Sequence, residues 1–242
     1  MTFALQHSGL TVSLAVSNDD RTACQRLRHL QFFGAEGVDN DPHDASCQHL
    51  MVHDGSGDLV ATARMMALDS GADFNCSFAA QHYDLKGFSG VREPLLEIGR
   101  FCVSTRMLDT DVLRVAWGAV TDYVDRRGVR YLFGCSSFQG IDPAPYGVAF
   151  ATLAAKYLGP DDLRPAIKSP LAVPFASVPR QGRTPLPSLL RTYLAMGGWV
   201  GDHAVVDPVM RTMHVFTCVD VANVPPSRAR SLRALAQGAA LS

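Results

Sequence analysis

Lysine is scarce in this sequence, and neither sign of charge is in excess. Of the 22 basic residues in 242, only Lys86, Lys156 and Lys168 are lysines, so nearly all cationic side chains are arginines. Their planar guanidinium groups suit carboxylates and phosphates. The 22 basic and 23 acidic residues leave a net charge of −1. Because no overall positive field attracts a phosphate polymer, nucleic acid is not an expected partner.

Patterns typical of secreted and membrane-spanning proteins are also missing. The six cysteines form no C-x-x-C pair and follow no secretory apolar segment, which favours a reduced, cytoplasmic setting. No uninterrupted apolar run approaches about 18 residues, so no span is expected. The glycine patterns G-x-x-x-x-G-K and G-x-G-x-x-G are absent as well, which argues against phosphate-loop NTPases and dinucleotide-binding folds.

Hydrophobic spacing predicts an α/β protein with a mixed central sheet flanked by helices. The clearest pattern is a hairpin, with a turn at 54–58 between strands at 49–53 and 59–68. A helix is predicted from Asn18 or Asp19 to Phe33, with Cys24, Leu27, Leu30 and Phe33 on its buried face. The other predicted elements are strands at 10–16, 95–104, 129–137, 199–206 and 212–219 and helices at 111–127, 145–158 and 186–196.

These elements are predicted to form a single domain over residues 1–225. Seven prolines between 159 and 187 predict an irregular excursion over the surface. Residues 226–242 form a basic C-terminal tail, which is predicted either to fray in solvent or to form a short amphipathic helix that contacts anionic lipid.

Glu97 and Arg100 are charged residues in the otherwise apolar stretch 95–103, where buried charges need partners. A regular strand would point them to opposite faces, but a bulge at Gly99 would return both to one face. Arg64, in the strand predicted at 59–68, could lie across from them. A purely structural ion-pair network explains the same pattern, so the residues alone leave both interpretations open.

Four stretches carry a specific resemblance: DASCQHLMV at 44–52, LEIGRFCV at 96–103, LFGCSSFQG at 132–140 and LRTYLAMGGWVG at 190–201. In these the chain resembles the ornithine-lipid-forming N-acyltransferases, a branch of the GCN5-related N-acetyltransferase (GNAT) fold. That branch is in turn similar to the acyl-homoserine-lactone autoinducer synthases. The last two stretches are peculiar to the ornithine-lipid branch, whereas the acid-rich loop, Arg64 and the Glu97/Arg100 pair are shared with the autoinducer synthases.

The resemblance implies transfer of a (3-hydroxy)fatty acyl group from acyl carrier protein to the α-amine of an amino acid. The product would be a lyso-aminolipid, and neither a metal nor a cofactor is implied beyond the donor's acyl-phosphopantetheine. The loop RMLDTD at 106–111 agrees with this donor. Coenzyme A enzymes of this fold have a glycine-rich loop there that binds the pyrophosphate, and a carrier-bound phosphopantetheine has no pyrophosphate.

On this resemblance, catalysis would rest on Glu97 as the base that accepts the amine proton. Arg100 and Arg64 would hold the acidic loop or the acceptor carboxylate. Backbone N–H groups near the bulge would polarise the thioester oxygen. The acyl donor would contact Phe101, Cys102, Val103, Ser136, Ser137 and Phe138.

The acceptor is expected to be L-ornithine, with glutamine as the alternative. Gln48 stands where the family commonly has aspartate, and MRTMHV at 210–215 replaces a stretch with another carboxylate. An ammonium side chain needs an anionic partner, so these changes favour a neutral acceptor unless the acidic loop supplies the anion. The expected acceptor-binding residues are Asp39, Asp41, Asp44, Gln48, His49, Arg211 and His214.

Other interpretations remain open at this point. The enzyme could be an autoinducer-type synthase, or the chain could be a non-catalytic member that only binds acyl carrier protein. Cys135 is more easily explained as an inert packed thiol than as a nucleophile. The cluster His43, Asp44, Cys47 and His49 fits no ordinary zinc spacing, so no metal is predicted. A basic tail and a lipid-like product leave peripheral contact with the inner membrane face as a further expectation.

Overall fold

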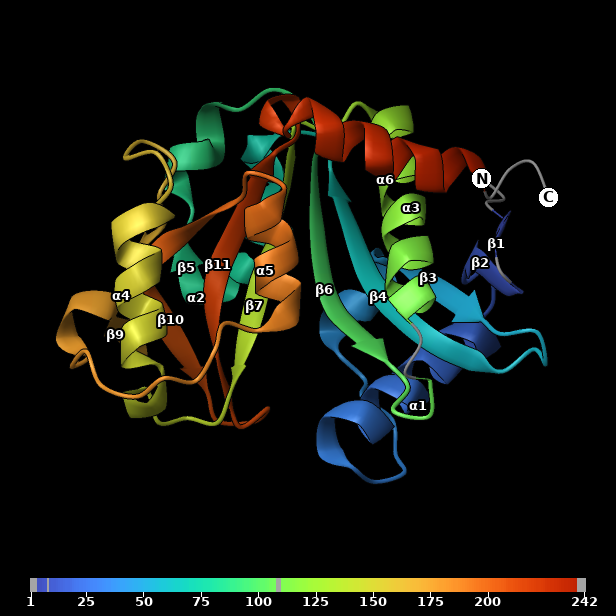
Figure 1. The fold of residues 1–242 in the computed structure, drawn as a ribbon, viewed down its shortest axis with the longest axis horizontal. Coiled ribbons are helices and arrows are strands. Elements are labelled where there is room, and N and C mark those ends of the chain that lie inside the picture. The colour runs from blue at the N-terminus through green and yellow to red at the C-terminus, as the bar shows by residue number, and fades with distance from the viewer. Residues whose placement is uncertain (1–3, 8, 108–109, 239–242) are drawn as a thin grey trace. The chain divides into compact units, whose positions relative to one another are not determined.

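The computed structural model describes residues 4–7, 9–107 and 110–238 (Figure 1). Their contacts divide the chain into two compact units. The first unit takes in the described parts of 1–67, 96–129 and 226–242, and the second takes in 68–95 and 130–225. The predicted α/β architecture, with sheet strands flanked by helices, is confirmed. The domain limit at residue 225 stays a prediction.

The first unit is built on five neighbouring strands. In spatial order they are β1 (Ala4–His7), β2 (Leu10–Leu14), β3 (Gln48–His53), β4 (Leu59–Leu68) and β6 (Leu95–Val103). β3 and β4 form the predicted hairpin, and Asp54 closes its turn by accepting hydrogen bonds from Ser56 N and Asp58 N. In the register of this hairpin, His49 lies opposite Arg64.

Three helices belong to the first unit: α1 (Asn18–Phe33), α3 (Thr110–Arg127) and α6 (Pro226–Gly238). Ser17 caps α1, one residue before the predicted start, because its hydroxyl accepts from Asp20 N while Asp20 accepts from Ser17 N. Gly34 ends the helix with a φ of 69°. The sequence therefore predicted the extent of α1 to within a residue.

The buried face of α1 matches the prediction at Cys24 but differs further along the helix. The helix buries Cys24, Gln25 and Arg28, whereas Leu30 and Phe33 are exposed. Apolar spacing was misleading because this helix covers a polar turn rather than an apolar core. Its two buried polar side chains have partners in that turn, described below.

The second unit contains an antiparallel run of β7 (Tyr131–Gln139), β11 (Thr212–Asp220), β10 (Trp199–Asp207) and β9 (Ala172–Pro174). Side chains alternate between the two faces of the strands. Phe138, Val200 and Val215 join one core cluster with residues of α4 (Gly147–Lys156) and α5 (Ser188–Ala195). Phe133, Phe216 and Trp199 instead meet aromatic rings of residues 68–95.

Residues 68–95 consist of 3₁₀ turns, α2 (Ala79–His82) and β5 (Tyr83–Asp84). β5 pairs with β8 (Ala166–Ile167). The stretch 159–187, predicted to be irregular, thus contains two short strands, β8 and β9. They form because β9 adds to β10 as an edge strand, where Pro174 is tolerated.

The basic tail is helical rather than frayed over its described residues. α6 packs closely on α3, since a Cβ placed at Gly118 would lie 3.3 Å from Leu235 Cβ. Arg233 Nε lies 2.7 Å from the Asp125 carboxylate. None of the helices in the described ranges is long and apolar enough to cross a membrane.

Candidate active site

The predicted acidic residues meet in a short turn after α1, within the first unit. Asp41 begins the 3₁₀ turn Pro42–Ser46 and accepts a hydrogen bond from His43 N at 2.9 Å. Asp44 reaches back to accept from Asp41 N at 3.3 Å. This reciprocal capping orients both side chains, and both are buried. The turn is therefore not the solvated loop that composition alone indicates.

Arg28 holds the turn from α1 and is fully buried. Its Nε lies 2.9 Å from Asp39 Oδ2, and its Nη1 and Nη2 lie 3.0 and 2.6 Å from the two carboxylate oxygens of Asp44. Gln25, one turn earlier on α1, donates to Asp44 Oδ2 at 2.8 Å. Sequence reasoning missed both residues. Arg28 follows Gln25 by three residues and Cys24 by four, and this spacing along one side of the helix was the available signal.

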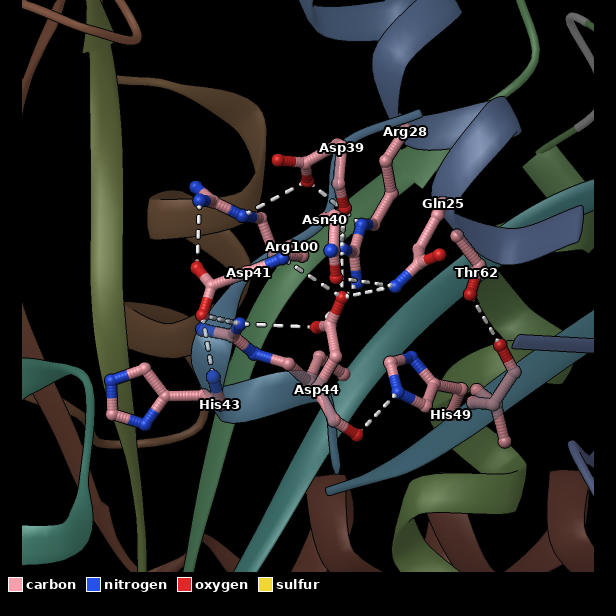
Figure 2. Close-up of polar contacts among 12 residues, drawn as sticks. Gln25, Arg28, Asp39, Asn40, Asp41, His43, Asp44, His49, Thr62 and Arg100 are labelled. Carbon is pink, nitrogen blue, oxygen red and sulfur yellow. Dashed lines mark hydrogen bonds and ion pairs between the residues drawn. The ribbon is translucent and has the colours of Figure 1, made fainter. Parts of the chain in front are cut away.

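Arg64 and Arg100 bind the same turn from β4 and β6. Arg64 Nη1 lies 2.8 Å from Asp41 Oδ1 and 3.3 Å from Asp44 Oδ1. Arg100 contacts Asp39 Oδ2 through Nε at 3.2 Å and Asp41 Oδ2 through Nη2 at 3.0 Å. Figure 2 shows Arg28 and Arg100 approaching the turn from opposite sides. Three guanidinium groups thus face three carboxylates.

The backbone of β6 departs from regular strand geometry at Arg100, whose φ is 52°. The sequence predicted an irregularity at Gly99, but the left-handed residue is the arginine that follows. A non-glycine residue in this region stores strain of roughly 1–3 kcal/mol, which the surrounding contacts must offset. The two ion pairs of Arg100 supply such contacts.

Charge compensation controls ionisation in the cluster. Burial by itself would raise the pKa of the Asp44 carboxyl, but hydrogen bonds from Arg28 and Gln25 outweigh burial and hold that pKa well below its usual range. Burial acts in the same way on Asp41, and the positive charges of Arg64 and Arg100 help to lower its pKa. Both carboxylates are therefore charged at neutral pH.

Glu97 is buried in β6, and Cys47 lies close enough for the two to interact electrostatically. Burial raises the pKa of the Cys47 thiol to about 12, and the charge of Glu97 adds to the effect. Cys47 is therefore a neutral thiol at physiological pH and no ready nucleophile. Glu97 is thus a buried carboxylate that shares its neighbour Cys47 with Arg64 of the cluster.

His49 of β3 supports the turn through the backbone of Asp44. It is 2% exposed, and its Nε2 lies 3.2 Å from the carbonyl oxygen of Asp44. A carbonyl only accepts, so Nε2 carries the proton. Among the described residues nothing hydrogen-bonds to the buried Nδ1. Gln48, the preceding residue, is exposed opposite Met65.

The predicted donor-binding residues of β6 lie beside the cluster, in the same unit. Phe101 stacks on Trp117 of α3, with ring centroids 6.4 Å apart. Cys102 is buried, which raises the pKa of its thiol to about 12. Val103 is half-buried at the end of the strand. Residues 108 and 109 of the pyrophosphate-loop position lie outside the described residues.

The remaining predicted site residues belong to the second unit. Ser136 is buried, and its hydroxyl accepts a hydrogen bond from Thr217 Oγ1. Ser137 is exposed, and Phe138 packs in the core against Phe150. Arg211 is exposed in the turn between β10 and β11, with a φ of 51°.

His214 is buried beside Tyr83, whose hydroxyl lies 3.1 Å from His214 Nδ1. Buried His203, which sequence reasoning missed, lies near the same tyrosine, and its Nδ1 is 2.7 Å from Asp202. Both imidazole rings lie against the ring of Tyr83. Ser137 lies directly opposite His214 in the register of β7 and β11.

The cluster does not resemble a metal centre. Among the described residues, no group of three or more histidine, cysteine, aspartate or glutamate side chains is arranged to hold a metal ion. The physical reason is that the carboxylates of the turn face guanidinium groups.

Comparison with known proteins defines the class. The family model described as "Acetyltransferase (GNAT) domain" matches residues 27–118, which include the acidic turn, Arg64, Glu97 and Arg100. The solved structure of FeeM, an N-acyl amino acid synthase from uncultured soil microbes, is similar with a TM-score of 0.51 at 14% identity, covering 95% of this chain and 97% of that one. The chain is an acyltransferase with the GNAT fold.

The curated proteins that this chain resembles are N-acyltransferases named for one acceptor. A protein of Rhodobacter capsulatus named L-ornithine N(alpha)-acyltransferase is 29% identical over 86% of this chain and 89% of its own length. One of the same name from Rhizobium meliloti is 29% identical over 90% of this chain and 82% of its own. The predicted resemblance to the ornithine-lipid-forming acyltransferases is confirmed.

Proposed function

We propose that this chain transfers a fatty acyl group, 3-hydroxylated or plain, from acyl carrier protein to the α-amine of an amino acid, giving a lyso-aminolipid. The observation that carries the proposal is the arginine–carboxylate cluster beside Glu97, in a chain whose relatives are named for N-acylation of ornithine. The donor's acyl-phosphopantetheine is the only group required.

In the proposed mechanism, Glu97 accepts the proton from the α-ammonium, directly or through one water, so that the neutral amine attacks the thioester. Backbone N–H groups at Phe101 to Val103 stabilise the oxyanion. The thiolate of the carrier then leaves and takes up the proton that the attacking nitrogen loses as it becomes the amide. No acyl-enzyme is needed, and the raised pKa of Cys47 agrees with direct transfer.

The contacts of Arg64 and Arg100 favour one of the two roles expected of them. Both guanidinium groups are engaged by aspartates of the turn, which supports a role in holding that turn against β6. An acceptor carboxylate would have to displace Asp39 or Asp41 from Arg100. Arg100 is the more exposed of the two arginines, and we assign this exchange to it.

L-Ornithine is the proposed acceptor, because both relatives compared above carry its name. Glutamine is the second candidate, and a specific observation favours it. Three arginines balance the three aspartates of the turn, so the turn offers no uncompensated carboxylate to an ammonium side chain.

In the test, purified protein is incubated with acyl carrier protein that carries a 3-hydroxyacyl chain. Ornithine and glutamine are present at equal concentrations. Product mass identifies the acceptor, and release of free carrier thiol measures turnover. Acyl-ornithine supports the first choice and acyl-glutamine the second. If neither amino acid is acylated, formation of an acyl-homoserine lactone in a separate reaction would instead indicate an autoinducer-type synthase. If the chain binds acyl carrier protein but no amino acid causes release of the carrier thiol, it is a non-catalytic member.

Peripheral association with the inner face of the membrane completes the proposal. A lyso-aminolipid product is an amphiphile, because it joins a fatty acyl chain to a polar amino acid. The product would therefore have to pass from the protein to a membrane surface.

A further inference from the structure

A basic surface in the first unit lies away from the acidic turn and has no assigned role. α6 contains no acidic residue, and Arg228, Arg230 and Arg233 are exposed along it. The C-terminal end of α3, on which α6 packs, adds exposed Arg126 and Arg127. These five arginines are called the α3–α6 surface below.

Two carboxylates of α3 neutralise part of this surface. Asp122 pairs with Arg126 at 2.8 Å, and Asp125 pairs with Arg233 at 2.7 Å. No ion pair joins Arg127, Arg228 or Arg230 to a carboxylate in the described ranges. Arg127, Arg228 and Arg230 are thus exposed positive charges without a carboxylate ion pair, in a chain whose net charge is −1. Because residues two apart project from different sides of a helix, Arg228 and Arg230 spread this charge around α6. A ligand of this region would be anionic.

The apolar side of α6 is already used. Leu232, Leu235 and Ala236 are half-buried, and Leu235 and Ala236 contact α3 at Gly118, where the absence of a side chain lets the helices approach. Among the side chains described for α6, no large apolar one is exposed. A helix whose apolar face is occupied does not insert into a bilayer but presents its charges to one.

This composition distinguishes between the two anionic partners that the proposed function offers. Protein interfaces have an apolar centre within a polar rim, whereas binding to lipid headgroups needs only a set of positive charges near the surface. Beside these arginines, the described part of α6 exposes no apolar side chain larger than those of Pro226 and Ala234. We propose that this surface binds anionic phospholipid headgroups and holds the protein at the membrane. The charge argument stands alone, and only the reason for such an anchor, release of a lipid product, rests on the proposed function.

The experiment is sedimentation of purified protein with vesicles of phosphatidylcholine containing about one third phosphatidylglycerol, and with vesicles of phosphatidylcholine alone. We expect binding only to the anionic vesicles, weakening as salt is raised. Arg228→Glu/Arg230→Glu should weaken it about tenfold or more, since each basic residue near an anionic surface contributes substantially. Arg228→Lys/Arg230→Lys keeps the charge and should bind like the unmodified protein.

Arg180→Glu/Arg183→Glu is the matched control, because both residues are exposed in the second unit and the variant changes net charge equally. It should bind the anionic vesicles within about twofold of the unmodified protein. The proposal is overturned if the unmodified protein does not bind these vesicles, or if the α6 reversal and the control weaken binding equally. It is also overturned if the α6 reversal weakens only binding to acyl carrier protein. Vesicle binding requires no substrate, so these outcomes are independent of whether acyl transfer is found.

Discussion

Arg28 holds Asp44 with both ends of its guanidinium group, Nη1 lying 3.0 Å from Oδ1 and Nη2 2.6 Å from Oδ2. Both side chains are buried, so each charge depends on the other for solvation. Asp44 also accepts from Gln25 and contacts Arg64. The pair therefore joins α1, the acidic turn and β4, and it is the contact through which the helix determines the position of the turn.

Loss of Arg28 should be strongly destabilising. Arg28→Ala leaves Asp39 and Asp44 without their main partner, and breaking a buried pair in this way costs about 3–5 kcal/mol. Urea unfolding measures the free energy directly. Arg26→Ala, an exposed position on the same helix, should change stability by less than about 0.5 kcal/mol. A loss below about 1 kcal/mol for Arg28→Ala would show that the turn is held by other contacts.

Glu97→Gln should fold normally but lose activity by about a hundredfold or more, since the amide preserves shape and removes basicity. Thiol release from acyl carrier protein at saturating donor and acceptor measures kcat, and thermal unfolding checks the fold. Glu93→Gln, at an exposed position nearby in sequence, is the control. Activity of Glu97→Gln within about threefold of the unmodified enzyme would exclude Glu97 as the base.

The left-handed backbone of Arg100 predicts an unusual order of stabilities. Arg100→Ala and Arg100→Gly both lose the ion pairs to Asp39 and Asp41. Glycine accepts a φ of 52° without strain, whereas alanine pays about 1 kcal/mol for it. Arg100→Gly should therefore be the more stable of the two in urea unfolding. The reverse order, which is usual within a strand, would mean that β6 relaxes to regular geometry once the side chain is removed.

Stability should fall as the solution is acidified, in two stages. Burial lowers the pKa of His49 below its ordinary value of 6.5, so the unfolded chain takes up this proton first and stability declines as pH drops below 6.5. Arginine contacts lower the pKa of Asp44 and Asp41, despite the opposing effect of burial, below the ordinary 3.8. Their contribution is complete well above pH 3.8 and is lost below it.

His49→Gln separates the two stages, because a glutamine amide can still donate to the Asp44 carbonyl but does not titrate. Urea unfolding at a series of pH values should show a flatter dependence immediately below pH 6.5, with the lower stage unchanged. An unchanged slope in the upper range would assign it to another histidine.

Acyl carrier protein should be preferred over coenzyme A as acyl donor. The sequence RMLDTD at 106–111 has two aspartates and no glycine where a pyrophosphate would bind. Comparison of kcat/KM for the same acyl chain on the two carriers should favour the protein by about tenfold or more. Equal values would show that pyrophosphate is accommodated elsewhere.

The sequence determined the elements that depend on local spacing and turn chemistry. The β3–β4 hairpin follows from Asp54 to Asp58 between apolar strands, and α3 follows from the helical spacing of Val120 and Val124. These features need no knowledge of distant residues. The motif around Glu97 and Arg100 was likewise visible, because two charges in an apolar strand stand out in one dimension.

Only the tertiary structure decided what those charges contact. Arg28 and Gln25 looked like solvent-facing residues of an amphipathic helix, and their burial depends on a turn 11 to 19 residues further along the chain. The left-handed residue proved to be Arg100 rather than Gly99, because ion pairs to Asp39 and Asp41 sustain a strain that sequence preference alone would place on glycine. The sequence therefore determined which segments form strands and helices, whereas long-range charge compensation, which has no periodicity along the chain, decided which polar residues the site is made of.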